Sequence, residues 1–195
     1  MARPLEHNRE EVIRAAMQVF WDKGYSATSM ADLKKATGLN PGSIYASYQS
    51  KEEFFISTLS FYCDQSLENL EISLSREGKY LENIHTFFKN FGNKSKTTEK
   101  GCFFVNTLIE MAPHNSKINE LLEHYTERYK SLFFNTLENA RRSNQIPEST
   151  NIQTKSDQLM LIIWGLRVMQ RSGSITESTE AIVSQQLEDT LGAVA

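Results

Sequence analysis

The sequence predicts an all-α protein of about nine helices, and three observations support this fold class. Apolar residues recur at three- and four-residue steps along almost the whole chain. No window alternates apolar and polar residues in the manner of a half-buried strand. Only four prolines and nine glycines interrupt the 195 residues, so long helices are possible. Because 39% of the residues are hydrophobic, the chain is able to bury a sizeable core.

The first two helices are marked by strong local signals. Apolar residues at helical spacing begin near Glu10, and Lys23 followed by Gly24 ends that helix. Ser29 or its neighbour Thr28 can cap the next helix, since Asp32 follows at the spacing of a capping box. Gly38 then breaks this second helix after residue 37.

A third short helix and a fourth long one follow. Asn40 is a capping residue and Pro41 suits the first helical position. Ile44 and Tyr48 of this helix are expected to face the core rather than solvent. Ser50 caps the fourth helix. Two short helices across a glycine turn, at about residues 29–48, form either a DNA-reading helix-turn-helix or an ordinary helical hairpin, and spacing alone leaves both open.

The rest of the chain predicts the remainder of the fourth helix and five further helices. Glycine and proline positions, together with two polar stretches expected to be loops at 92–100 and 145–154, divide them. The expected helices are the remainder of the fourth helix to about residue 75, then 80–91, 103–111, 116–140, 155–171 and 176–192. We expect two domains, 1–52 and 53–195.

Composition excludes several classes of protein. The net charge of −3 argues against a polycation, although residues 1–52 carry seven Lys or Arg against six Asp or Glu, and the remainder 14 against 18. Apolar runs such as 159–164 are too short to span a bilayer, and residues 1–11 lack a secretory pattern, so we expect a cytoplasmic protein without membrane partners. The two cysteines do not make a disulfide framework.

Motifs for metal, nucleotide or hydrolytic chemistry are missing from the sequence. The four histidines are scattered, and no glycine-rich phosphate loop or nucleophile elbow is present, so no metal, no cofactor and no enzyme activity is expected. A helical enzyme that uses Cys102, Glu110 or His114 remains an alternative, supported only by proximity in sequence. A helical interaction module that has lost DNA binding is another.

The segment TSMADLKKATGLNPGSIYASYQSKEEFF, which begins at Thr28, resembles the signature of the TetR/AcrR family of transcriptional regulators. The typed positions include Leu33, the turn glycine Gly38, residues 42–45, Tyr48 and residues 50–52, and they cover about a quarter of the chain. The family implies a helix-turn-helix domain joined to a helical ligand-binding and dimerisation domain.

The resemblance implies DNA contacts along the third helix, which would be the recognition helix. Asn40, Pro41, Gly42 and Ser43 match positions that touch bases and phosphates, and Tyr45 matches a tyrosine that lies against the DNA backbone. No Arg, Lys, Gln or His is present in this helix, so bidentate base contacts are few and DNA shape is expected to contribute to specificity.

Flanking residues complete the DNA contacts that the resemblance implies. Ala46 and Ser47 fall on or near the groove-facing side, and Lys51 matches a lysine that contacts phosphate. Thr28 and Ser29 lie where a helix N-terminus directs backbone amides at phosphate.

The family also implies that the last two helices form a homodimer, which reads a palindromic operator in double-stranded DNA. The apolar stripe of the 155–171 segment is the expected dimer interface, with core packing within one protomer as the alternative. Its members are Leu159, Ile162, Ile163, Leu166 and Met169.

A small apolar or electrophilic effector is the other partner that the family implies. Aromatic residues in the middle of the chain, among them Phe88, Phe103, Tyr125 and Tyr129, are plain core or line its pocket. Gly101-Cys102 resembles the opening found in a branch that includes the repressor of N-ethylmaleimide reductase, where a cysteine senses electrophiles and oxidants. We expect Cys102 to be reactive, because it begins a helix beside Lys100; the alternative is an inert small side chain.

The sequence therefore predicts a sequence-specific DNA-binding transcriptional regulator. Repression that is released by a small effector or by cysteine modification is the expected mechanism.

Overall fold

The computed structural model describes residues 5–94, 100–174 and 176–191, and all regular secondary structure within these ranges is helical. This confirms the predicted fold class. Within these ranges, no helix combines the length and apolar character that crossing a membrane requires. The described elements are α1 Leu5–Lys23, α2 Met30–Thr37, α3 Pro41–Tyr48, α4 Lys51–Leu74, α5 Tyr80–Lys94, α6 Phe103–Glu110, the 3₁₀ turn η2 Ala112–His114, α7 Ser116–Arg142, α8 Ile152–Arg171 and α9 Glu177–Leu191.

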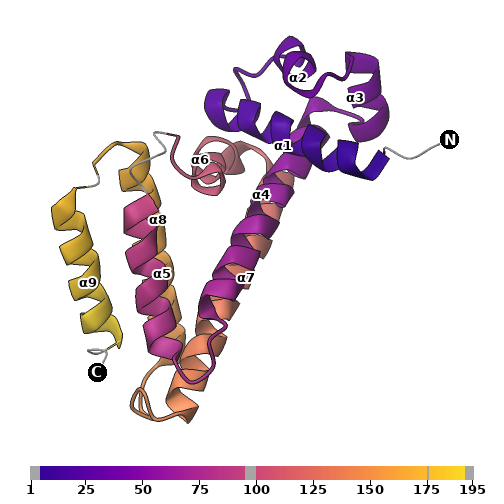
Figure 1. Ribbon diagram of the computed structural model, residues 1–195. Helices are drawn as coiled ribbons and strands as arrows, with labels where there is room; N and C mark the ends of the chain where they lie inside the picture. Colours follow the sequence, from indigo (N-terminus) through magenta and orange to yellow (C-terminus); the bar gives the residue numbers. More distant parts are fainter. Residues whose placement is uncertain (1–4, 95–99, 175, 192–195) are drawn as a thin grey trace.

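Helices α1, α2 and α3 gather at one end of the molecule, which we call the head (Figure 1). The long helices α4 and α7 run side by side away from it, and α5, α8 and α9 complete the body. Helix α6 lies between the head and the body. Because α4 is continuous through residues 52 and 53, the expected domain boundary falls inside a helix and stays a prediction.

Local capping fixes the two short helices of the head where the sequence predicted them. Ser29 Oγ accepts a hydrogen bond from the Asp32 amide at 3.1 Å, and the Ser29 amide donates to Asp32 Oδ2 at 2.9 Å. Gly38 ends α2 with φ of 73°, a left-handed conformation that glycine adopts without steric cost. Asn40 Oδ1 accepts from the Ser43 amide at 2.8 Å and so caps α3.

The head has an aromatic and aliphatic core that holds α3 in place. Ile44 and Tyr48 are buried, as predicted, and the Tyr48 ring stacks on Phe54 of α4 with centroids 4.1 Å apart. Phe20 of α1 packs edge-on against Phe55 of α4 at 5.1 Å. The inner face of α3 is therefore fixed, and its opposite face is turned outward.

The predicted boundaries of α8 and α5 differ from the structure, whereas α7 begins at Ser116 as predicted. Helix α8 begins at Ile152 rather than residue 155, because Asn151 Oδ1 accepts from the Thr154 amide at 3.0 Å and caps it. Asn115 caps α7 in the same manner. Helix α5 continues to Lys94, so the predicted loop at 92–100 begins as helix, and residues 95–99 lie outside the described ranges.

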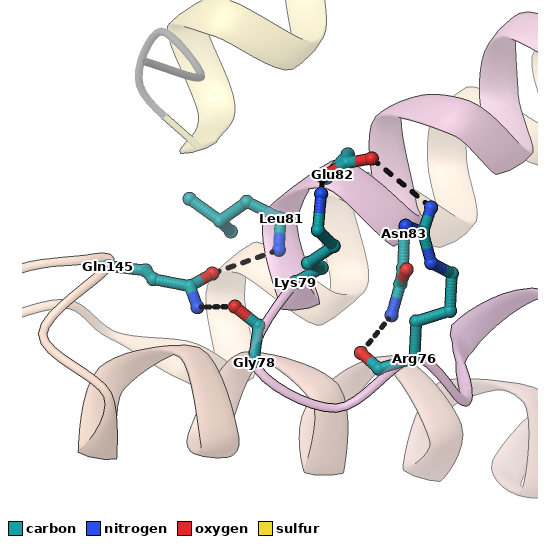
Figure 2. A network of polar contacts seen from close by, with 7 residues as sticks. All are labelled: Arg76, Gly78, Lys79, Leu81, Glu82, Asn83 and Gln145. Atoms are coloured by element: carbon teal, nitrogen blue, oxygen red, sulfur yellow. Dashed lines mark hydrogen bonds and ion pairs between the residues drawn. The ribbon is translucent and has the colours of Figure 1, made fainter.

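The turn between α4 and α5 lies at the end of the body farthest from the head (Figure 1), and side-chain amides hold it (Figure 2). The buried Asn83 side chain donates to the carbonyls of Leu74 and Arg76 at 3.1 and 2.9 Å. Gln145, which follows α7, accepts from the Leu81 amide at 3.2 Å and donates to the Gly78 carbonyl at 2.9 Å. These bonds replace the backbone partners that the turn leaves unsatisfied.

Candidate nucleic-acid interface and cavity

The outward face of α3 is formed by small side chains. Asn40, Pro41, Gly42, Ala46 and Ser47 are exposed. At 100° per residue, Gly42 and Ala46 lie opposite the buried pair Ile44 and Tyr48. Asn40 and Pro41 are exposed at the start of the helix and Ser47 at its flank. The sequence-predicted residues are thus solvent-accessible along one short helix, where a duplex can approach closely.

Two further predicted residues of α3 lie at the edge of this surface. Tyr45 is 47% exposed, which is unusual for a large aromatic side chain in this chain. Ser43 is half-buried, and its amide is occupied by the Asn40 cap. A Cβ atom on Gly42 would lie 3.3 Å from the capping oxygen of Asn40, so glycine leaves room for the cap.

The N-terminus of α2 differs from its prediction at one residue. Ser29 is exposed, as a phosphate contact requires. Thr28 is only 2% exposed and its hydroxyl donates to the Gly24 carbonyl at 2.7 Å, so its prediction as a DNA contact is wrong. Asp32 accepts from Lys23 at 2.6 Å, and this hydrogen bond, with others from Ser29, lowers the pKa of Asp32. A carboxylate therefore lies beside the amides that were expected to face phosphate.

Lys51 is tied to the head rather than extended into solvent. Its ammonium donates to the Tyr25 carbonyl at 2.7 Å and lies 4.4 Å from the centre of the Tyr25 ring. Burial lowers the pKa of Lys51. The residue links the start of α4 to the turn after α1, and its phosphate contact stays a prediction.

A cavity of about 630 Å³ lies in the body beneath the head, and its wall comes from α1, α4, α5, α6, α7 and α8. Cys102 and Tyr129, two of the five predicted effector residues, line it. Most of the wall was not predicted; in addition to those two it comprises Met17, Trp21, Tyr62, Gln65, Ser66, Asn69, Leu70, Ile72, Ser73, Arg76, Thr86, Phe87, Asn90, Phe104, Val105, Met160, Ile163, Trp164 and Arg167.

Phe88, Phe103 and Tyr125 are not among the residues that line this cavity, so their prediction as its lining is corrected. Phe88 is fully buried and stacks on Phe133 at 6.2 Å, on the inner face of α5. Phe103 packs edge-on against an aromatic ring of α4 at 5.4 Å. The Tyr125 hydroxyl donates to Asp64 Oδ1 at 2.8 Å, which directs its ring along α4. All three side chains are buried and pack against neighbouring helices.

Cys102 is the residue before α6. Its side chain forms part of the cavity wall, although the residue is only 7% exposed. Its sulfur lies 3.4 Å from the Tyr62 hydroxyl. Lys100, expected to act on this thiol, instead forms an ion pair with Asp22 of α1. The other cysteine, Cys63, is completely buried, and burial raises its pKa well above the ordinary thiol value. Such a thiol is inert.

The predicted dimer stripe of α8 is turned mainly inward. Leu159 and Leu166 are buried in the core of the protomer, so their prediction as interface residues is wrong. Ile162, Ile163 and Met169 are half-buried, and Ile163 lines the cavity. The exposed apolar side chains of the last two helices are instead Leu161, Val168 and Ile182.

Two family models match the chain. The model of the N-terminal domain, described as "Bacterial regulatory proteins, tetR family", matches residues 12–58. The model described as "Tetracyclin repressor-like, C-terminal domain" matches residues 79–183, more than half of the chain. The first covers the head and the start of α4, and the second covers the body from α5 to α9.

Individual relatives agree with these models. The HTH-type transcriptional repressor ComR of Escherichia coli (strain K12) is 29% identical over 188 residues, which cover 95% of this chain and 90% of ComR. A cysteine mutant of the TetR family regulator CifR, complexed with 26-base-pair operator DNA, superposes with a TM-score of 0.83 at 22% identity and covers 96% of this chain and 98% of its own. The reduced form of E. coli NemR superposes with a TM-score of 0.79 at 20% identity, with 97% and 98% covered.

All of these relatives are described as regulators of transcription and none as an enzyme. The structural likenesses extend along nearly the whole chain and show the same fold. The chain belongs to the TetR family of bacterial regulatory proteins.

Proposed function

We propose that this protein is a homodimeric transcriptional repressor that binds a palindromic operator in double-stranded DNA and is released by a small molecule bound in the cavity. The observation that carries the proposal is the outward face of α3, on which Asn40, Gly42, Ala46 and Ser47 are exposed while Ile44 and Tyr48 anchor the helix from behind. A regulator that binds the bacterial chromosome acts in the cytoplasm.

The dimensions of α3 suit the major groove. An α-helix with its side chains is about 10–12 Å across, and the major groove of B-DNA is about 12 Å wide. Small side chains at Ala46 and Ser47 allow the helix backbone to come close to base edges. Asn40 and Tyr45 supply hydrogen-bonding groups beside these small side chains. Because no basic side chain reaches from the helix, sequence preference depends on these few contacts and on DNA shape.

A second copy of the chain is the partner that the exposed face of α8 suits. Leu161 and Val168 are exposed and lie seven residues apart, so they share one face of the helix. Gly165 lies between them, and no atom is within 4 Å of where its Cβ would be, which allows another helix to approach closely. Ile182 extends the apolar surface onto α9. A two-fold dimer would present two α3 helices to half-sites about one turn of DNA apart.

The cavity is placed where an occupant can influence the head. Trp21 belongs to α1, the first helix of the head, and yet its ring lines the cavity. It packs edge-on against Tyr62 of α4 with centroids 5.1 Å apart. An occupant that displaces either ring changes the position of α1 relative to α4 and thereby the orientation of α3.

Modification of Cys102 is a second route to release, supported by its place in the cavity wall. Among the relatives, NemR has a structure of its reduced form and CifR has a structure of a cysteine mutant. Addition of the Cys102 thiol across the double bond of N-ethylmaleimide would form a carbon–sulfur bond and transfer the thiol proton to the neighbouring carbon. The adduct would fill part of the cavity next to Tyr62.

Operator binding is tested by selecting DNA fragments with the purified protein and sequencing them. A palindromic consensus is expected, bound with an affinity that falls as salt rises. Random fragments without a shared sequence would contradict the proposal. For the thiol route, the gel shift is repeated with N-ethylmaleimide on the wild type, on Cys102→Ser and on the control Cys63→Ser. Loss of the shift in all but Cys102→Ser is expected, and an equal response of all three proteins would exclude Cys102.

A further inference from the structure

We propose that the cavity binds an aromatic carboxylate, with the acid group held at Arg167 and Tyr62 and the ring system held among the aromatic side chains of the wall. The inference rests on the proposed function only in assigning the cavity to an effector. It adds the chemical class of that effector, which neither the fold nor the relatives specify.

Aromatic rings dominate the apolar part of the wall. The cavity volume of about 630 Å³ is within the range typical of small-molecule sites. Phe104 and Tyr129 meet edge-on with centroids 6.0 Å apart, and Trp21 meets Tyr62 in a similar way at 5.1 Å. Flat ligands gain from such edges and faces beyond the area that they bury. The rings that line the cavity are Trp21, Tyr62, Phe87, Phe104, Tyr129 and Trp164.

The charged side chains of the wall have one sign. Among the described lining residues, Arg76 and Arg167 are positive and no Asp or Glu is present. Arg76 forms an ion pair with Glu82 at 3.2 Å in the turn between α4 and α5, and its side chain is 60% exposed (Figure 2). Arg167 is half-buried on α8, and one of its contacts is a hydrogen bond from its guanidinium to the Gln170 side chain at 3.1 Å. The cavity therefore favours an anion, and Arg167 is the more interior of its two cations.

Two phenol side chains, Tyr62 and Tyr129, line the same cavity as Arg167. Burial raises the pKa of Tyr62 well above its usual value and has the same effect on Tyr129, so both phenols keep their protons. A guanidinium beside a phenol offers charge-assisted and neutral hydrogen bonds to one carboxylate. An ammonium ligand would meet like charge in the same place.

Binding at this position would connect the acid group to the head. The Tyr62 ring packs on Trp21 of α1, and its hydroxyl lies 3.4 Å from Cys102 Sγ. A carboxylate that draws the Tyr62 hydroxyl toward itself would weaken this contact with sulfur. Both tryptophans of the chain line the cavity, so their fluorescence reports its occupancy.

The test uses the full-length protein without DNA and three probes of one shape: naphthalene-2-carboxylate, naphthalene-2-carboxamide and 2-naphthylmethylammonium. Calorimetry is expected to give the carboxylate an affinity about tenfold or more above the carboxamide, with the ammonium weakest. Quenching or a shift of tryptophan emission should accompany binding. Equal affinities of carboxylate and carboxamide would overturn the proposal, as would the absence of binding by all three.

Variants locate the acid group. Arg167→Gln should remove the preference for carboxylate over carboxamide, Arg167→Lys should retain part of it, and the matched control Arg76→Gln should leave it intact. If Arg167→Gln does not fold, Tyr62→Phe serves instead and should reduce the preference several-fold. A preference that survives these changes, or that is lost equally in Arg76→Gln, would refute the assignment. Operator binding is measured separately, so its failure would refute the proposed function while leaving these results to stand.

Discussion

The two candidate sites of this molecule are assembled in opposite ways. The proposed DNA-binding surface comes almost entirely from one short helix, α3, and the residues that cap it. The cavity takes its wall from six helices that are distributed from α1 to α8. A surface that belongs to one helix is altered by one substitution without consequence elsewhere. A cavity shared by six helices would couple them, because a molecule that fills it would contact several of them at once.

The largest expected effect concerns the outer face of α8, which belongs to neither site. Replacing both Leu161 and Val168 by Glu should dissociate the dimer and weaken operator binding by about 1000-fold, because two unpaired charges would enter the interface. Analytical ultracentrifugation measures the first effect and gel shift the second. Gln153→Glu, an exposed change in the first turn of the same helix, should leave the protein dimeric. A double variant that remains dimeric would show that the interface lies elsewhere.

A pair of leucines two residues apart on α8 separates the inner from the outer face. Leu159→Ala should reduce the free energy of unfolding by about 2–5 kcal/mol, because a fully buried side chain leaves a cavity. Leu161→Ala, at a position that is 65% exposed, should change it by less than about 0.5 kcal/mol when corrected for protein concentration. Urea unfolding checks both, and equal losses would contradict the orientation of α8.

A substitution at Ser47 tests whether the exposed face of α3 is independent of the cavity. Ser47→Glu places a carboxylate against phosphate and should weaken operator binding by about 100-fold. The melting temperature and the affinity of the cavity for naphthalene-2-carboxylate should not change. Ser131→Glu, an exposed change on α7, is the matched control. Reduced probe affinity in the Ser47 variant would show that the two sites are not independent in this direction.

The smallest expected effect depends on pH and arises in the body. His85 of α5 is half-buried, and no described group bonds its Nε2 atom. Burial lowers the pKa of His85, and the charge of Glu188 on α9 opposes this shift. Since the unfolded chain then binds a proton at higher pH than the folded protein, stability is present above about pH 6.5 and declines as pH falls toward and below the folded pKa. When the pH is lowered from 7.5 to 5, the melting temperature of His85→Gln should fall by about 1–2 °C less than that of the wild type. If the melting temperatures of the two proteins fell equally with pH, His85 would not be the source of the pH dependence.

The head was predictable because its signals act between neighbours in sequence. The pair Ser29 and Asp32, the stop at Gly38 and the cap at Asn40 each require a residue type at a fixed offset. Only Thr28 was misplaced, since its hydroxyl turns back to Gly24, and a capping pattern does not distinguish which of two adjacent hydroxyls remains exposed.

The body was less predictable because orientation there is decided by distant contacts. Helix α8 carries apolar residues around most of its circumference, so Leu159 and Leu161 look alike in sequence although one is buried and the other exposed. Likewise Phe87 lines the cavity and its neighbour Phe88 packs in the core. Trp21 had no local signal at all, since it belongs to a helix that was assigned to the head.

Helix α4 begins at the Ser50 cap beneath α3 and carries Tyr62, Gln65 and Asn69 into the cavity wall. Its 24 residues give it a length of about 36 Å. A tilt of only about 5° around its far end would carry Ser50 through roughly 3 Å, close to the rise of one base pair in DNA. Helix α4 would thus act as a lever. A displacement near the cavity that is too small to disturb the packing there would become one large enough to move α3 out of register with the major groove.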